Sequence, residues 1–154
     1  MMYKVETSPG TPWLVAAAWM SVAAALAHLA CIIGGPDWFR FMGAPEPLIR
    51  AYENGNDRLV YITIFIGAIL AGWGLWAFSA AGWIIRLPLL NTALFLIAAV
   101  LLIRAAMIFF PGFWDPQHSG SFRIWTSGIC LAMGLCFAIG LWRGWPSLGK
   151  RKQP

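Results

Sequence analysis

Hydrophobic residues along the chain are gathered into four long runs that carry almost no charge, separated by more polar connections. The runs cover residues 13–34, 59–80, 89–110 and 124–142. Each is close to the ~20 apolar residues that a helix needs to cross ~30 Å of hydrocarbon. The pattern predicts an all-α integral membrane protein whose four transmembrane helices form a compact bundle. The connections leave no room for another core, so we expect residues 1–154 to be a single membrane domain.

The first run also has the position and the alanine content of a secretory signal peptide. A signal peptide has a hydrophobic region of ~7–15 residues that ends at a small-residue cleavage site. Here the apolar run is longer and closes on Gly34-Gly35-Pro36. We therefore expect it to be retained as the first transmembrane helix.

The long connection, residues 36–58, does not have the pattern of an ordinary solvated loop. It starts with apolar residues around Trp38, and after Pro47 apolar and charged positions alternate with a helical period as far as Asn54-Gly55. An Asn-Gly pair is typical of a helix end. We expect a short amphipathic helix that lies in the outer interface of the membrane or folds back over the mouth of the bundle.

Composition identifies the bilayer as the solvent of this chain, and the placement of charge predicts its orientation. Charged residues make up only 11% of the sequence, against ~25% in soluble domains. Lysine and arginine concentrate on the cytoplasmic side of membrane proteins. With both termini cytoplasmic, six basic residues lie inside and four outside, which favours this orientation in a bacterial inner membrane. The inner set is Lys4, Arg86, Arg143, Lys150, Arg151 and Lys152, and the outer set is Arg40, Arg50, Arg58 and Arg123.

The basic residues that follow the last run form a short tail beside the membrane. Anionic lipid headgroups attract such a tail by ~1 kcal/mol for each cation near the surface. Membrane lipid is therefore the expected partner. One short tail without a domain or groove argues against nucleic acid.

Two ionisable side chains, His28 and Arg104, lie inside the runs, where charge is costly and usually marks a site or a buried pair. Each is about two turns from the outer end of its run, or ~10 Å below the outer surface at ~1.5 Å of rise per residue. Other polar groups fall at the same depth, so we predict an outward-facing polar pocket that binds a ligand. The predicted ligand-binding residues are His28, Arg104, Cys31, Tyr61, Ser127 and Cys130.

Arg104 keeps its charge under all ordinary conditions and needs an acceptor. The candidates are an anionic ligand or an acidic side chain of the outer loops, namely Asp37, Glu46, Glu53, Asp57 or Asp115. The alternative is that Arg104 reaches out to the interface and that His28 bonds to a neighbouring serine or carbonyl group. The residues alone leave both arrangements open.

The residues exclude several chemistries more firmly than they identify one. A haem held by two histidines would need a second histidine within the membrane, but His118 falls in a loop. The three cysteines lack the Cys-x-x-Cys spacing of a thiol relay, and four converging zinc ligands are missing. The sequence therefore names no catalytic residue, metal or cofactor.

Three functions remain open at this point. The first is a non-catalytic membrane protein, either an accessory subunit or a binder of a lipid-like or quinone-like molecule in the pocket. The second is a small membrane enzyme that acts on an amphipathic substrate, with His28 as general acid or base. The third is a transporter, although the chain shows no internal repeat.

Small residues recur every four positions on the last run, at Gly128, Ala132, Cys136 and Gly140. Such a stripe lets two membrane helices approach closely. We expect it to pack against a neighbouring helix of the bundle, with a homodimer or a larger membrane complex as the alternative. Gly134 lies off the stripe and is expected to tolerate a larger side chain better than Ala132.

The stretch AHLACIIGGPDWFRFMGA at 27–44, with Trp-Gly-Leu-Trp at 73–76 and Arg-Leu-Pro-Leu-Leu at 86–90, resembles a set of small uncharacterised bacterial four-helix inner-membrane proteins. The resemblance covers nearly the whole chain and brings no activity with it. By topology alone the chain is also similar to the DoxX-like proteins and to the sterol-isomerase-like bundles. An isomerase pocket of that kind would be expected to hold acidic residues within the spans, and this chain has none there. The resemblance therefore implies a four-helix membrane bundle and no particular reaction.

Overall fold

The computed structural model describes residues 8–110, 112, 114 and 118–148. Within this part the chain forms helices and no strand. Asp115 and the basic residues 150–152 lie outside the described residues. The helices are α1 (Thr11–Gly34), α2 (Pro36–Phe41), α3 (Glu46–Glu53), α4 (Arg58–Ala81), α5 (Leu90–Ala106), the short 3-10 helix η1 (Met107–Phe109) and α6 (Gly120–Leu148).

Four stretches of helix are long and apolar enough to cross a membrane. They are Thr11–Gly34, Arg58–Ala81, Leu90–Phe109 and Gly120–Trp145. All eight ends fall within four residues of the ends predicted from the hydrophobic runs. The described part of the chain is therefore all-helical, with the make-up of a multi-pass membrane protein, as the pattern predicted.

Local capping groups set the helix ends where hydrophobicity alone does not. α6 starts four residues before the apolar run because the Ser119 hydroxyl accepts the N–H of Phe122 at 3.2 Å, as an N-cap does. α4 ends at Gly82, whose φ of 82° is left-handed and whose N–H donates to the Ser79 carbonyl at 3.1 Å. These polar signals extend or stop a helix regardless of where the membrane run ends.

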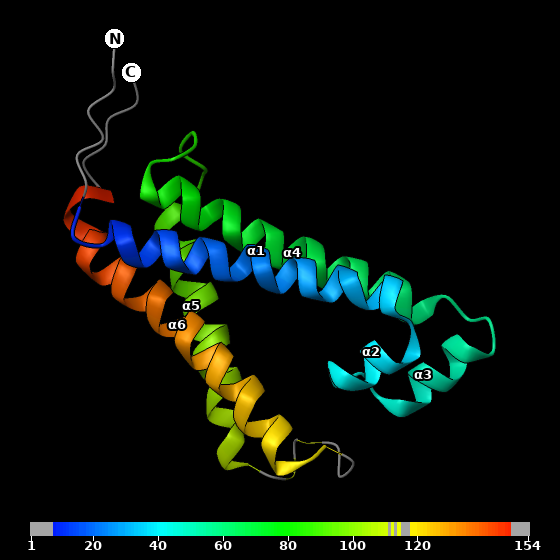
Figure 1. Cartoon of the computed structure of the whole chain (residues 1–154). Helices are drawn as coiled ribbons and strands as arrows, with labels where there is room; N and C mark the ends of the chain where they lie inside the picture. Colours follow the sequence, from blue (N-terminus) through cyan, green and yellow to red (C-terminus); the bar gives the residue numbers. More distant parts are fainter. Residues whose placement is uncertain (1–7, 111, 113, 115–117, 149–154) are drawn as a thin grey trace.

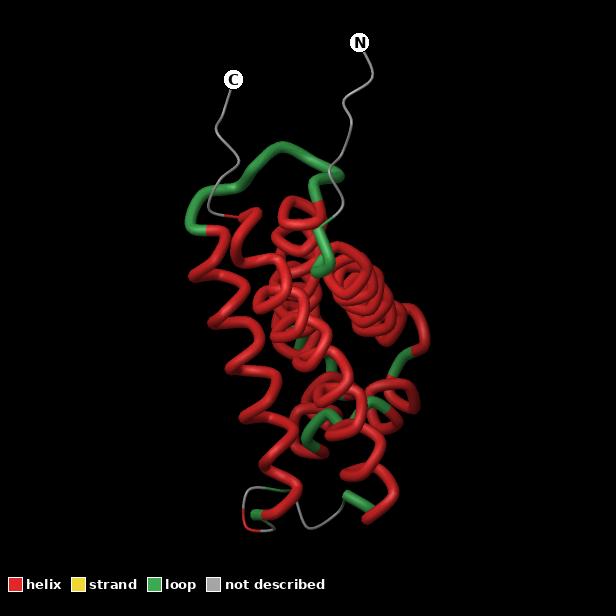
Figure 2. The backbone as a smooth tube through the Cα atoms, turned by 90° about the vertical axis from the view of Figure 1, so that its left-hand side faces the viewer, coloured by secondary structure: helices red, strands yellow, loops and turns green. Residues whose placement is uncertain are grey.

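The long helices form two antiparallel pairs that meet at one end of the molecule. α1 packs along α4, and α5 packs along α6. The start of α1, the end of α6 and the connection 82–89 lie together at this end, which we call the terminal end (Figure 2). Toward the opposite end, called the far end, the two pairs diverge (Figure 1). The far ends of α1 and α4 carry α2 and α3, which together we call the lobe.

The buried residues follow this division and form two separate cores. The main core joins the terminal halves of all four long helices. The second core holds the lobe on the far ends of α1 and α4, and consists of Cys31, Phe39, Ile49 and Leu59. The main core consists of Leu14, Ala17, Ala18, Ala77, Ala80, Ala81, Leu90, Leu94, Ile97, Ala98, Leu101, Met133, Phe137 and Leu141.

The amphipathic helix expected in the first connection is present as α3, with Ile49 fully buried. α2 precedes it, and Arg40 of α2 ties the lobe together by bonding Glu53 at 2.8 Å, Glu46 at 3.3 Å and Asp37 at 3.3 Å. The hydrogen bond from Arg40 holds the pKa of the Glu46 carboxyl below its usual value. The lobe is thus a small folded unit, apolar where it meets α1 and α4 and ionic on its exposed side.

The predicted packing of the small-residue stripe against a neighbouring helix of the bundle is wrong over its first half. Gly128 has nothing within 4 Å of the position of a Cβ, and Ala132 is exposed. Gly134 is the close contact with α5, because a Cβ there would lie 2.9 Å from Leu102. A step of four residues turns 40° around a helix at 3.6 residues per turn, so a four-residue repeat drifts off any one face. Gly140 does lie in a seam, but the neighbour there is α1.

Candidate functional site

One face of α1 changes from fully buried to half-buried along its length. Leu14, Ala17 and Ser21 have no exposed surface. Ala24 and His28 continue the same face at alternating steps of three and four residues, yet both are only partly covered. The covering helix therefore leaves this face in the far half of α1.

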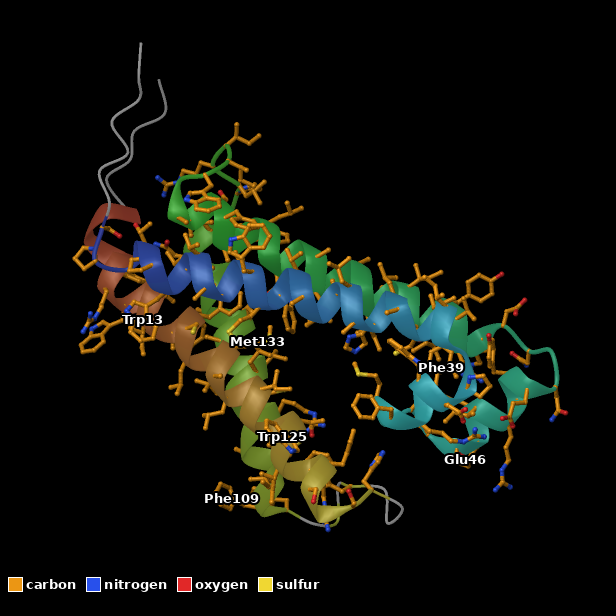
Figure 3. The ribbon with its side chains drawn as sticks, in the orientation of Figure 1. Trp13, Phe39, Glu46, Phe109, Trp125 and Met133 are labelled. Atoms are coloured by element: carbon orange, nitrogen blue, oxygen red, sulfur yellow. The ribbon has the colours of Figure 1, made fainter. Side chains whose placement is uncertain are left out.

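α6 carries the matching face. Phe137 and Met133 are buried, whereas Cys130 and Thr126, farther along the same three-and-four spacing, are half-buried. Burial therefore decreases on both helices in the same direction, which agrees with the divergence of the two pairs. Figure 3 shows the labelled Met133 nearer to the place where the pairs meet, and Phe39 and Trp125 on the separate branches.

Register between the two helices places the half-buried residues at one depth. The Leu14 side chain occupies the space beside Gly140, where a Cβ would lie 2.8 Å from it. His28 lies fourteen residues after Leu14 on α1, and Thr126 lies fourteen residues before Gly140 on α6. At ~1.5 Å of rise per residue, each is ~21 Å along its helix from the contact between Leu14 and Gly140. We call Ala24, His28, Thr126 and Cys130 the far-end site.

His28 is held in one orientation by its own helix. Its Nδ1 lies 2.8 Å from the carbonyl oxygen of Ala24. A carbonyl only accepts, so Nδ1 must carry the proton of the bond, and in the neutral ring Nε2 is then an acceptor. A neutral His28 ring thus offers one acceptor, Nε2, for a ligand. This is the local bonding that the sequence left open as the alternative for His28.

Arg104 lies on the other pair and has different partners. Its guanidinium carbon stands 4.4 Å from the ring centroid of Trp114, a cation–π contact. It also lies close enough to Cys130 for an electrostatic interaction with that thiol. Of the acidic side chains proposed as its acceptor, Asp37, Glu46 and Glu53 bond Arg40 of the lobe instead.

The other three predicted residues are placed apart from this group. Cys31 is buried in the second core, where its thiol donates to the carbonyl of Ala27 at 3.3 Å. Tyr61 is 69% exposed on α4. Ser127 is buried, and its Oγ has no hydrogen-bond partner. It shares a face with Gly134, seven residues on, so it looks toward α5. Of the six predicted residues, the structure thus places Arg104 near Cys130, whereas His28 lies on the other helix pair and bonds within its own helix.

A chain of aromatic contacts at the far end was missed by the sequence reasoning. The His118 ring stacks on Phe122 with centroids 4.6 Å apart and makes an edge contact with Trp114 at 6.4 Å. Trp114 in turn lies under Arg104. Only the spacing of four between His118 and Phe122 could have signalled it, because the remaining contacts depend on how the connection folds.

Thr126 was also missed by the sequence reasoning, because Ser127 beside it was predicted to be the polar residue of the site. Its hydroxyl donates to the carbonyl of Phe122 at 2.9 Å. The alternating three-and-four spacing from Phe137 and Met133 identifies Thr126 once the buried face of α6 is known. Without a neighbour to fix that face, adjacent serine and threonine residues are equivalent.

A pocket of about 460 Å³ lies at the terminal end, away from the far-end site. It is lined by residues 86–92, in the connection before α5 and the first turn of that helix. Leu89 has a left-handed φ of 54° there, which is unusual for a residue with a side chain. The position of this pocket differs from that of the outward-facing pocket expected from the sequence.

No protein-family model matches the chain, and no curated protein or solved structure is significantly similar to it. The resemblance to small bacterial inner-membrane proteins therefore stays a prediction. What the chain does has to be argued from its own residues.

Proposed function

We propose that the chain is a non-catalytic protein of the bacterial inner membrane, with both termini cytoplasmic, that holds a lipid-like or quinone-like molecule at the far-end site. In this orientation the far end faces outward, and the lobe lies at the outer interface. The six-to-four excess of basic residues that the sequence assigns to the side of the two termini supports it.

One observation carries the proposal: the faces of α1 and α6 that pack tightly around Leu14 and Phe137 are only half covered at His28 and Cys130. In a bilayer the exposed part of these side chains meets hydrocarbon or a bound molecule. Plain hydrocarbon offers no hydrogen-bond partner to Nε2 of a neutral His28 ring, and an unpaired polar group is costly in an apolar medium. A molecule with an apolar body and a hydrogen-bond donor or a polar head satisfies both requirements.

The same geometry favours binding over catalysis. An enzyme that used His28 as acid or base and Arg104 to orient the substrate would need both groups on one reactant. Arg104 is instead engaged with Trp114 and Cys130 on the other helix pair. A binder needs only the acceptor of His28 and an apolar wall.

Native mass spectrometry of the detergent-extracted protein tests this function. The variant Ala24→Trp fills the far-end site, and Ala23→Trp adds the same side chain at the neighbouring exposed position. The wild type and Ala23→Trp should retain a discrete small molecule that Ala24→Trp loses. Equal retention in all three proteins would contradict the site, and a wild type that carries a protein subunit instead of a small molecule would replace the binder by an accessory subunit.

A further inference from the structure

The far ends of the two helix pairs are joined by a contact between the lobe and α6. The ring of Phe122 sits directly on Gly43, in the place that a Cβ of Gly43 would occupy. Gly43 follows α2, whereas Phe122 lies in the first turn of α6. The contact therefore bridges the divergence on the side of the far-end site that faces away from the main core.

Both sides of this contact are held in place. Gly43 has a left-handed φ of 80°, and its N–H donates to the Arg40 carbonyl at 3.0 Å as part of the turn that ends α2. Phe122 is stacked on His118 at 4.6 Å. Trp114, beside His118, is fixed by a 2.9 Å bond from its ring N–H to the Met107 carbonyl. The contact is thus between two ordered surfaces.

The two helix pairs share a core only at the terminal end. The second core belongs wholly to α1, α4 and the lobe. Phe122 and Gly43 belong to neither core, so separating them would not by itself expose a core residue. The lobe would move with α1 and α4, because Cys31 and Leu59 anchor it there.

We propose that the contact between Phe122 and Gly43 is a gate that separates the far-end site from the aqueous phase at this end. The inference rests on the proposed binding function and adds the route to the site. While the gate is closed, an amphipathic molecule reaches His28 from the bilayer, between the diverging helix pairs. When the gate opens, the polar head of the bound molecule is exposed to water.

Cysteine accessibility in lipid nanodiscs tests the gate, since both faces of the bilayer are then open to a charged methanethiosulfonate reagent. The background replaces Cys31, Cys130 and Cys136 by alanine, and Ala24→Cys reports on the site. An open state populated at ~10% or less is expected for a closed gate, so opening it fully should raise the labelling rate at least about tenfold. Phe122→Ala should give this rise, and Trp125→Ala, an exposed ring on the next turn, should not.

A second variant opens the gate from the other side without removing an aromatic ring. Gly43→Ala puts a Cβ into the space of the Phe122 ring and also strains the backbone at a left-handed φ of 80°. Both effects disfavour the closed contact, so labelling should accelerate in the same way. Thermal unfolding of each variant identifies any that fail to fold. Gly43→Ala and Phe122→Ala change different sides of the contact, so either variant can test the gate if the other does not fold. Equal labelling rates of Ala24→Cys in the Phe122→Ala, Gly43→Ala and Trp125→Ala variants would overturn the gate. The gate would also be overturned if Ala24→Cys in the background protein were labelled as fast as Asn54→Cys in the lobe.

The labelling rates do not depend on a bound molecule, so the gate and the binding function fail separately. Faster labelling in both gate variants with no retained molecule in native mass spectra would reject the binding function and keep the gate. A retained molecule with unchanged labelling rates would reject the gate and keep the binding function.

Discussion

Gly134 on α6 gives the sharpest prediction about packing, because Gly128 on the same helix provides a matched control. A Cβ at Gly134 would lie 2.9 Å from Leu102 and 3.2 Å from the Cβ of Leu101, whereas a Cβ at Gly128 would meet nothing within 4 Å. Gly→Ala adds helix propensity at both positions, worth up to ~1 kcal/mol. At Gly134 it also forces the Leu102 side chain and the neighbouring part of α5 to shift, and overpacking of this kind costs about 1–3 kcal/mol.

The propensity gain cancels when the two alanine variants are compared, so the difference isolates the packing cost. Gly134→Ala should unfold more easily than Gly128→Ala by about 1–3 kcal/mol. Unfolding by titration with SDS in mixed micelles, followed by circular dichroism, measures this free energy. Equal stability of the two variants would show that α5 and α6 do not meet at Gly134, and with it the arrangement of the α5–α6 pair would fail.

Three further predictions concern the lobe, the terminal end and the orientation. The pKa of Glu46 is lowered mainly by Arg40 and also by Arg50, so its contribution to the lobe is present above its usual pKa of 4.5 and is lost as the pH falls through the lower folded value. Hydrogen exchange of α3 should accelerate there, and Arg40→Gln should weaken this pH dependence more than Arg50→Gln does. Ser79→Ala should cost about 1–3 kcal/mol of unfolding free energy, because the buried Ser79 hydroxyl donates to the Ile85 carbonyl at 2.9 Å and accepts the Leu87 N–H at 2.8 Å. Ser21→Ala is the control and should change the thermal unfolding little, since Ser21 bonds only a carbonyl of its own helix. A reporter fused at the C-terminus should be active in the cytoplasm and one inserted at Asn54 in the periplasm, and the inverse pattern would reverse the orientation.

The parts of the fold that depend on hydrophobicity and local caps could be predicted from the sequence. The four long helices follow from runs of apolar residues, and α3 follows from the alternation that ends at Asn54-Gly55. Both signals act within one helix and need no knowledge of its neighbours. The exact ends were less predictable, because a single hydroxyl such as that of Ser119 can extend a helix beyond its apolar run.

Contacts between helices could not be predicted in the same way. The face of α6 that meets α5 contains Gly134, and the sequence offered an equally plausible stripe through Gly128. In a membrane helix the lipid-facing side is as apolar as the buried side, so periodicity does not tell one from the other. The common depth of His28 and Arg104 was inferred from rise per residue, but depth says nothing about the divergence that gives them separate partners.

Site-specific photo-cross-linking in intact membranes tests the central claim most directly. A benzophenone amino acid replaces Thr126, at the far-end site, or Gly128, which is exposed on the same helix two residues away. After irradiation, mass spectrometry of the purified protein should show one discrete small-molecule adduct at position 126 and the mixture of bulk phospholipids at position 128. The same phospholipid mixture at both positions would contradict a bound molecule at the far-end site.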